Sequence, residues 1–227
     1  MALNIVSTID QRISVKHVLL SVSDKTGLDT FVPALLAACP EVKLLSTGGT
    51  YTALQKMLSA EQASKHLVSV SDYTGQPEMQ GGLVKTLDFK IYLGILSETY
   101  NEAHQQDLKR TQAVAIDMVV VNLYPFKQAV AKPDVTPESA RTNIDIGGPC
   151  MVRASAKNYL RVASVTDPAD YAALITELKA NKGMLSLETR FALMKKAFAH
   201  TAAYDTAIAD FFAHVAPERV NQTYQLK

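Results

Sequence analysis

The sequence predicts one α/β domain, over residues 17–215, with a mostly parallel central sheet. Short apolar runs typical of buried strands alternate with longer segments of helical periodicity along this range. The first two strands each end in small and hydroxylic residues, in the stretches VLLSVSDKTG (18–27) and VKLLSTGGT (42–50). Parallel strands joined by helices place such loops together at the carboxyl edge of the sheet, where open α/β sheets bind ligands.

The elements follow from local pattern in chain order. Strands are predicted where short apolar runs occur, at 17–20, 42–45, 67–70, 117–123 and 161–166. Helices are predicted from apolar spacing or start signals at 28–38, 51–58, 168–180 and 187–215, with others opening at Thr136 and after Gly147. Residues 117–123 are the most hydrophobic strand, so we expect them at the centre of the sheet. We expect an irregular lead-in at 1–16, a polar connection at 59–65, an exposed helix or loop at 100–110 and a tail at 216–227.

Bulk properties narrow the class of protein. The 227 residues carry a formal net charge of +1 and a mean hydropathy of +0.03, so neither nucleic acid nor membrane is expected as a partner. Cys39 and Cys150 are the only cysteines, a pattern that fits the reducing cytoplasm better than a disulfide framework. The N-terminus lacks the basic-then-apolar order of a signal peptide, and no apolar run approaches membrane-spanning length.

The loops after the first two strands suit an oxyanion. Gly27, Gly48 and Gly49 let backbone amides approach a ligand closely, and Lys25 adds a positive charge. Helices that start near these loops would direct their positive ends at the same point. The alternative is that the Ser, Asp and Thr residues merely cap two helices. Two such loops at neighbouring strand ends favour a phosphate site.

Polar residues placed just past strand ends are the candidates for chemistry. They are Ser21, Ser23, Lys25, Thr26, Ser46, Gly48, Gly49, Thr50, Lys85, Thr86, Asn122, Tyr124, Asp145 and Lys157. Three lysines, an aspartate and a tyrosine on one edge could bind phosphate and move protons. For Lys85 and Lys157 a solvated helix lysine is an equally good interpretation, and for Tyr124 packing at a strand end is the better one.

The sequence lacks the motifs of several other kinds of functional site. No histidine has a partner at metal spacing, so no zinc site is expected, and His200 is interpreted as a satisfied core or interface residue. The sequence contains no nucleophile elbow, Walker loop or Rossmann fingerprint.

Seven motifs resemble one known family. They are SVSDKTG, STGGT, VSDYTG-x-PEM-x-GG with VKTL, DMVVVNLYPF, NIDIGGP-x-MVRA-x-AKN and KAFAHTAAYD-x-AIA, in order over about residues 18–212. Together they resemble the N-terminal inosine-monophosphate (IMP) cyclohydrolase domain of the bifunctional enzyme that also carries aminoimidazole-carboxamide-ribotide (AICAR) transformylase. The resemblance implies a methylglyoxal-synthase-like fold, a three-layer α/β domain. It also implies closure of the second purine ring of 5-formamido-imidazole-4-carboxamide ribotide, with loss of water and without a cofactor.

The resemblance also implies residue roles. The residues implied for phosphate and ribose are Ser21, Ser23, Lys25, Thr26, Ser46, Thr47, Gly48, Gly49 and Thr50. Those implied around the base are Lys85, Thr86, Asn122, Tyr124, Asp145, Gly147 and Lys157. Among these, Lys157, Asp145 and Tyr124 are predicted to relay protons at the formyl oxygen, and Lys85 is predicted to assist deprotonation of the attacking amide. The reaction is intramolecular, so holding the two reacting arms together is itself a large part of catalysis.

One loop departs from the family pattern. The family reads G-R-V-K-T-L-H-P-K-x-H-x-G where this chain reads GLVKTLDFKIYLG, so Leu83 replaces an arginine and Asp88, Phe89 and Tyr92 replace His, Pro and His. A leucine cannot make the charge-assisted bonds of an arginine. Two hypotheses follow: an active cyclohydrolase with a rebuilt loop, or a non-catalytic module that binds a purine nucleotide monophosphate.

The transformylase signature is missing from the sequence. We therefore expect no transformylase activity, and a separate AICAR transformylase as the partner that supplies substrate. His200, Tyr204 and the long C-terminal helical region offer a surface for a homodimer.

Overall fold

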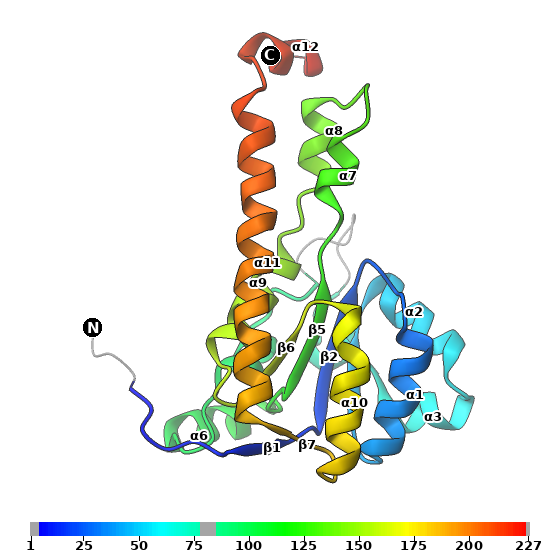
Figure 1. The fold of residues 1–227 in the computed structure, drawn as a ribbon, viewed down its shortest axis with the longest axis vertical. Helices are drawn as coiled ribbons and strands as arrows, with labels where there is room; N and C mark the ends of the chain where they lie inside the picture. Colours follow the sequence, from blue (N-terminus) through cyan, green and yellow to red (C-terminus); the bar gives the residue numbers. More distant parts are fainter. Residues whose placement is uncertain (1–4, 78–84, 226–227) are drawn as a thin grey trace.

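A five-stranded parallel sheet lies at the centre of the computed structural model, which describes residues 5–77 and 85–225. Its strands, in the spatial order β4-β3-β2-β5-β6, are β4 Leu67–Ser69, β3 Lys43–Ser46, β2 His17–Val22, β5 Met118–Asn122 and β6 Ala163–Val165. The two central strands pair in register from Val18 with Met118 to Val22 with Asn122. All five strands therefore end at one carboxyl edge, as the sequence predicted (Figure 1).

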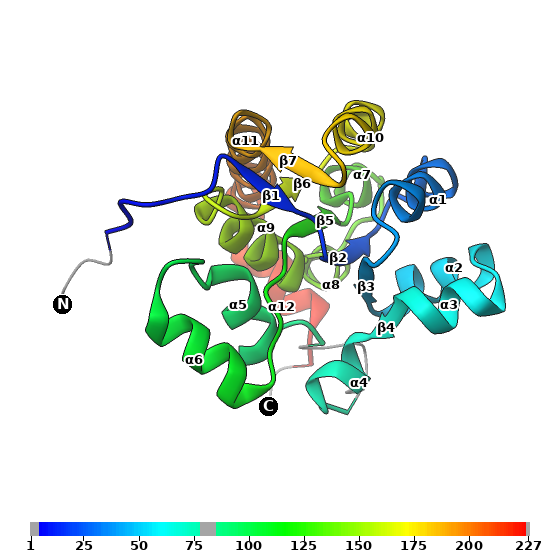
Figure 2. The ribbon, with the colours of Figure 1, turned by 90° about the horizontal axis from the view of Figure 1, so that it is seen from below.

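Helices cover both faces of this sheet (Figure 2). On one face the core joins Val18 and Leu20 to α1 Leu28–Ala38 and α10 Tyr171–Ala180. On the other face Leu19 and the alternate residues of β5 pack on α5 Phe89–Leu96 and α9 Gly147–Lys157. Successive strand residues point to opposite faces, so a strand buried on both sides is apolar at consecutive positions, and this is the pattern of residues 118–121. The three-layer α/β class is confirmed.

Shorter elements complete the described chain. They are α2 Gly48–Met57, α3 Ala60–His66, α4 Val70–Thr74, α6 Glu102–Thr111, α7 Phe126–Val130, α8 Pro137–Thr142, the 3₁₀ turn η2 Pro168–Asp170 and α12 Pro217–Thr223. An antiparallel ribbon pairs β1 Arg12–Ser14 with β7 Met184–Ser186. No helix among residues 5–77 and 85–225 combines the length and the apolar character needed to cross a bilayer.

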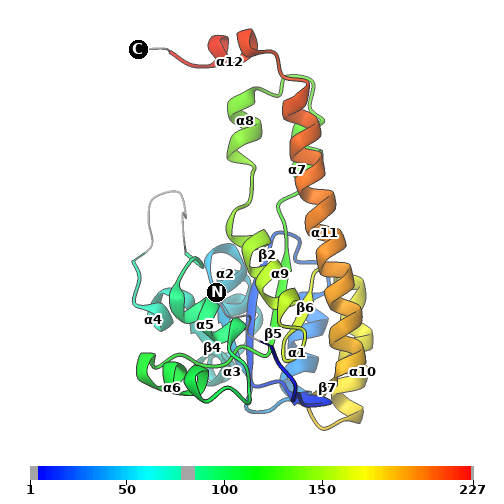
Figure 3. The ribbon, with the colours of Figure 1, turned by 90° about the vertical axis from the view of Figure 1, so that its left-hand side faces the viewer.

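One helix extends well beyond the sheet. The 27 residues of α11 Leu187–Ala213 give it a length of about 40 Å. Its first half packs along β6 and α9, and its second half rises past the carboxyl edge beside α7 and α8, with α12 across the top (Figures 1 and 3). We call α7, α8, α12 and the second half of α11 the arm.

Local signals explain both the correct and the wrong boundaries. The helix predicted at 28–38 is confirmed, and Thr136 caps α8 as expected. The polar connection predicted at 59–65 is wrong, because Ser59 and Gln62 form a capping box that starts α3. The lead-in at 1–16 and the tail at 216–227 are not wholly irregular, since they contain β1 and α12.

Candidate functional site

Two ammonium groups flank the start of α2. A β-carbon built on Gly48 would lie 4.0 Å from Lys85 Nζ, and one built on Gly49 would lie 3.9 Å from Lys25 Nζ. Gly48 has a φ of +56°, a conformation that L side chains rarely adopt, so glycine is required where the chain turns from β3 into the helix. The helix start, with its free N–H groups, and the two lysines together form a cradle for a dianion such as phosphate.

The loop after β2 is shaped by its own polar groups. The Asn122 side chain donates to the Asp24 carbonyl and accepts from the Asp24 N–H, both at 2.8 Å. The Asp24 carboxylate in turn accepts from the backbone and the hydroxyl of Thr26 at 2.9 and 2.6 Å, and these bonds lower its pKa. Asn122 therefore orients the loop that carries Ser23 and Lys25. Its role around the base stays a prediction.

Two predicted phosphate ligands turn inward. The Ser46 hydroxyl is fully buried and donates to the Leu20 carbonyl at 2.9 Å. The Thr50 hydroxyl accepts from the Val22 N–H at 3.0 Å and donates to the Val22 carbonyl at 3.1 Å. These hydroxyls join β2 to β3 and α2, so they are not open to a nucleotide, whereas the backbone N–H of Thr50 still lies in the first turn of α2. Thr47 differs: its buried hydroxyl has no hydrogen-bond partner among the described residues. Its role in nucleotide binding stays a prediction.

Asp145 defines a second group of residues at the same edge. It lies just before α9, where its carboxylate accepts the Gly148 N–H at 2.9 Å and also the backbone N–H of Tyr124. Burial raises the pKa of Asp145, and the two amide bonds oppose this shift. The Tyr124 side chain is 56% exposed, so its phenol remains open to a bound molecule. A carboxyl group whose pKa is raised toward neutrality suits proton transfer.

Residues 85–86 join the two groups. Lys85 reaches the start of α2, and the next residue, Thr86, is buried with its hydroxyl 2.7 Å from where a β-carbon on Gly147 would lie. Only glycine allows α9 to start this close to Thr86. The starts of two helices, α2 and α9, thus meet on either side of one dipeptide at the carboxyl edge.

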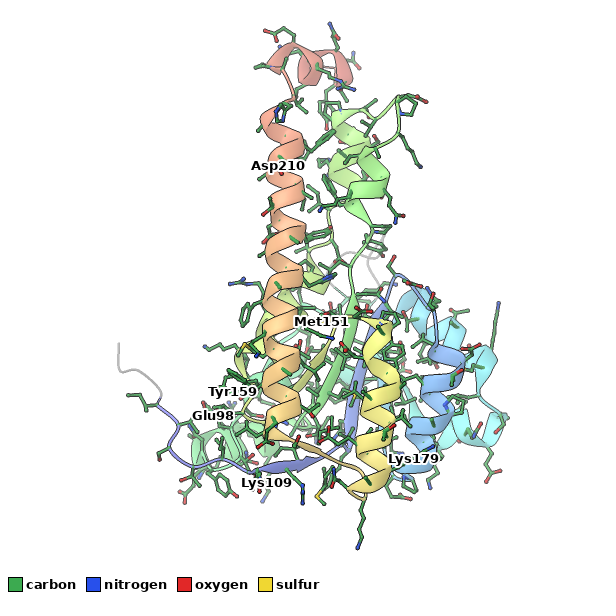
Figure 4. All side chains as sticks on the ribbon, viewed as in Figure 1. Glu98, Lys109, Met151, Tyr159, Lys179 and Asp210 are labelled. Carbon is green, nitrogen blue, oxygen red and sulfur yellow. The ribbon has the colours of Figure 1, made fainter. Side chains whose placement is uncertain are left out.

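Lys157 does not belong to this site. It is the last residue of α9, whose 11 residues span about 16 Å, and the other end of that helix is the one beside Asp145. In Figure 4, Tyr159, two residues after Lys157, lies near Glu98 at the end of the domain opposite the arm. The predicted proton relay through Lys157 is therefore corrected: its side chain is exposed and lies toward the amino edge of the sheet.

Sequence reasoning missed one contact of the site. The Tyr204 hydroxyl, from α11, accepts the backbone N–H of Asp145 at 2.8 Å. The signal was the buried stripe of α11, on which Leu193, Ala197 and Tyr204 lie at helical spacing. His200, one turn before Tyr204, is half-buried with its Nε2 lacking a partner among the described residues, so it is not the satisfied histidine that we expected. Burial lowers the pKa of His200.

The departures from the family loop are partly visible. Leu83 lies outside the described residues. Asp88 is buried: its carboxylate accepts the Lys90 N–H at 2.7 Å, which caps α5, and the Gln76 side-chain amide at 2.7 Å. It therefore ties the two ends of the segment that contains residues 78–84.

Other parts of the described structure lack the features of a functional site. A cavity of about 420 Å³ lies at the other end of the domain, between residues 5–10 and 98–103, and it contains no candidate residue. Within the described ranges 5–77 and 85–225, no three His, Cys, Asp or Glu side chains gather as metal ligands would. The carboxyl edge, with its two lysines at the start of α2 and its half-buried carboxylate, is the candidate site.

The fold and the site define an MGS-like domain. Residues 30–150 match the model of that family, and residues 155–227 match the model described as the AICARFT/IMPCHase bienzyme. The chain belongs to the MGS-like domain family.

Individual proteins of known sequence or structure are also similar to this chain. The bifunctional purine biosynthesis protein PurH of Streptococcus pneumoniae strain 70585 is 47% identical over 216 residues, which cover 93% of this chain and 40% of that protein. PurH of strain JJA gives the same identity and coverage. The crystal structure of ForH superposes with a TM-score of 0.75 and 31% identity, covering 87% of this chain and 97% of ForH. The chain thus spans about 40% of the length of the curated relatives it matches.

Proposed function

We propose that this chain is an IMP cyclohydrolase, which closes the second ring of 5-formamido-imidazole-4-carboxamide ribotide. The observation that carries the proposal is the cradle formed by Lys25, Lys85 and the start of α2 at the same sheet edge as the half-buried carboxylate of Asp145. A nucleotide monophosphate needs the first feature and a proton transfer at its base needs the second. The similarity to PurH over 93% of the chain supports this choice of reaction.

The reaction asks little beyond positioning and proton movement. The carboxamide nitrogen attacks the formyl carbon, and the formyl oxygen takes up a proton to become a hydroxyl group. This hydroxyl then leaves with a proton from the former formamide nitrogen, so one water is lost and a C=N bond forms. We assign these proton transfers to Asp145, a choice supported by its raised pKa and by the exposed phenol of Tyr124, whose backbone N–H it accepts.

A direct assay tests the proposal. The purified chain should convert the formylated ribotide to IMP faster than the spontaneous reaction, and Asp145→Asn should lower kcat by about 10²-fold or more, the usual size of a lost general acid or base. Asp210→Asn is the matched control, since this exposed carboxylate lies on the arm (Figure 4) and should leave kcat unchanged. A wild-type rate no higher than the spontaneous one would overturn the proposal. Tight IMP binding without turnover would point instead to a nucleotide-binding module.

The setting of the enzyme is part of the same proposal. A separate AICAR transformylase would supply the substrate, and the free thiols of Cys39 and Cys150 are consistent with the cytoplasm. The Tyr204 side chain is 9% exposed, so it does not offer the dimer surface that the sequence predicted. A homodimer is proposed instead through the exposed side of the arm. Sedimentation at several concentrations tests the dimer, and a monomer throughout would exclude it.

A further inference from the structure

Tyr204 connects the arm helix to the loop that carries Asp145. Its hydroxyl accepts the Asp145 N–H at 2.8 Å and lies 3.3 Å from the Asn143 carbonyl, to which it donates. The ring packs edge-on against Phe126 of α7, with 6.3 Å between ring centroids. The phenol therefore satisfies both backbone groups of a turn that belongs to neither α8 nor α9.

The orientation of this turn decides what the Asp145 carboxylate can reach. The carboxylate accepts the Gly148 N–H at 2.9 Å and the Tyr124 N–H, and both amides lower the pKa of Asp145 against the effect of burial. A rotation of the backbone at residue 145 would break these two bonds, because they require the side chain to leave the chain in one direction. Tyr204 fixes that direction by holding the N–H of the same residue.

The helix that presents Tyr204 is itself firmly seated. Ala197 and Thr201, on the preceding turns of α11, are almost fully buried against the domain. The phenol hydrogen-bonds to a residue 59 positions away in the sequence, so the bond joins two otherwise separate parts of the chain. Such long-range ties between rigid elements hold a catalytic group more precisely than the loop could alone.

We propose that Tyr204 is a positioning residue for Asp145, acting through the backbone of residues 143–145. The part of this inference that concerns catalysis rests on the proposed cyclohydrolase function. The part that concerns the carboxylate does not, since it can be measured without substrate.

The expected pH effect has a definite sign. The groups that face Asp145 are the Gly148 amide from α9, the Tyr124 amide after β5, the Tyr204 phenol from α11 and the segment before α5, where Lys85 precedes Thr86. If the turn relaxes, the carboxylate loses hydrogen bonds that favour its charged form. The pKa of Asp145 then rises further, and the acidic limb of the activity profile moves to higher pH.

Tyr204→Phe tests the inference because it removes one hydroxyl group and keeps the ring. In ¹³C-carboxyl and amide NMR of the unliganded protein, the titration midpoint of Asp145 should move to higher pH and its amide should exchange faster by about tenfold, the usual effect of one lost hydrogen bond. With substrate, kcat should fall by a similar factor of about ten while KM changes little. Tyr73→Phe is the matched control, since the Tyr73 phenol accepts the Val114 N–H at 2.9 Å away from the carboxyl edge.

Each outcome decides the point. An unchanged Asp145 titration and amide exchange in Tyr204→Phe would overturn the inference, as would the same shift in Tyr73→Phe. An inactive wild-type protein would refute the proposed function and leave the NMR comparison valid. Should Tyr204→Phe not fold, 3-fluorotyrosine at position 204 weakens the phenol as an acceptor with little change in shape, and a smaller shift in the same direction is expected.

Discussion

A single methyl group at Gly148 would test how tightly the site is built. A β-carbon at this position would lie 2.4 Å from Asp145 Oδ2 and 2.7 Å from Leu123 Cδ2. Ordinary contact begins at 3.4 Å, so in Gly148→Ala the carboxylate must retreat by about 1 Å. A misplacement of this size costs about 10²-fold in rate when the displaced group takes part in the reaction. We therefore expect kcat to fall by about 10²-fold.

The same substitution should change stability far less. Overpacking costs about 1–3 kcal/mol, and alanine gains up to about 1 kcal/mol over glycine inside a helix. The net loss in the free energy of unfolding is therefore about 0–3 kcal/mol. Gly148→Ala should remain folded at the assay temperature, and its lost activity would reflect the position of Asp145.

Gly94→Ala supplies the control for this experiment. Gly94 lies in α5, away from the site, and a β-carbon there would lie 2.4 Å from the Val114 carbonyl oxygen, the same overlap as at Gly148. It should lower the unfolding midpoint in a thermal scan and leave kcat per folded molecule unchanged. The reasoning is refuted if Gly148→Ala keeps kcat within threefold of wild type, or if Gly94→Ala loses as much.

Three further predictions concern stability. Asp145→Asn should raise the unfolding midpoint at pH 7, because burial raises the pKa of Asp145 and so penalises the charged carboxylate in the folded protein. This gain in stability should vanish as pH falls below the ordinary Asp range, because the wild-type carboxyl is then protonated in both the folded and the unfolded protein. Thr50→Val should lower the free energy of unfolding in urea by about 1–3 kcal/mol, since it removes the acceptor of the buried Val22 N–H and leaves Lys25 Nζ as the donor to the Val22 carbonyl. Arg161→Met should cost about 3–5 kcal/mol in the same assay by stranding the buried carboxylate of Asp117, and adding Asp117→Asn should restore part of the loss.

The fold was largely predictable because each layer has its own period in the sequence. Residues 118–121 are apolar at every position, which a strand covered on both faces requires, and they form a central strand. The β1–β7 ribbon was not predictable, because three-residue strands leave too short a pattern to read. Their pairing depends on the tertiary arrangement of two distant segments.

The sequence predicted the location of the site better than the role of each residue in it. Lys25, Lys85 and Asp145 follow strand ends or their loops, and the parallel sheet brings them to one edge. Ser46 and Lys157 failed for geometric reasons: strand alternation turns the first inward, and helix length carries the second away. Some polar groups hydrogen-bond within the protein and others stay open to a ligand. The direction of each side chain decides between the two, and position in the sequence does not give that direction.

The strand order has a consequence for synthesis of the chain on the ribosome. The central strand β2 is made first of the five, yet the neighbour on one of its sides is β5, whose partner residue for Val18 is Met118. At about 5–20 residues per second, roughly 5–20 s pass before that neighbour emerges. During this time one side of a very apolar strand is an open edge, the kind of surface that recruits other chains. The nascent protein should therefore depend on chaperones more than its final stability suggests, and ribosome-bound chains that end before β5 should aggregate more readily than those that include it.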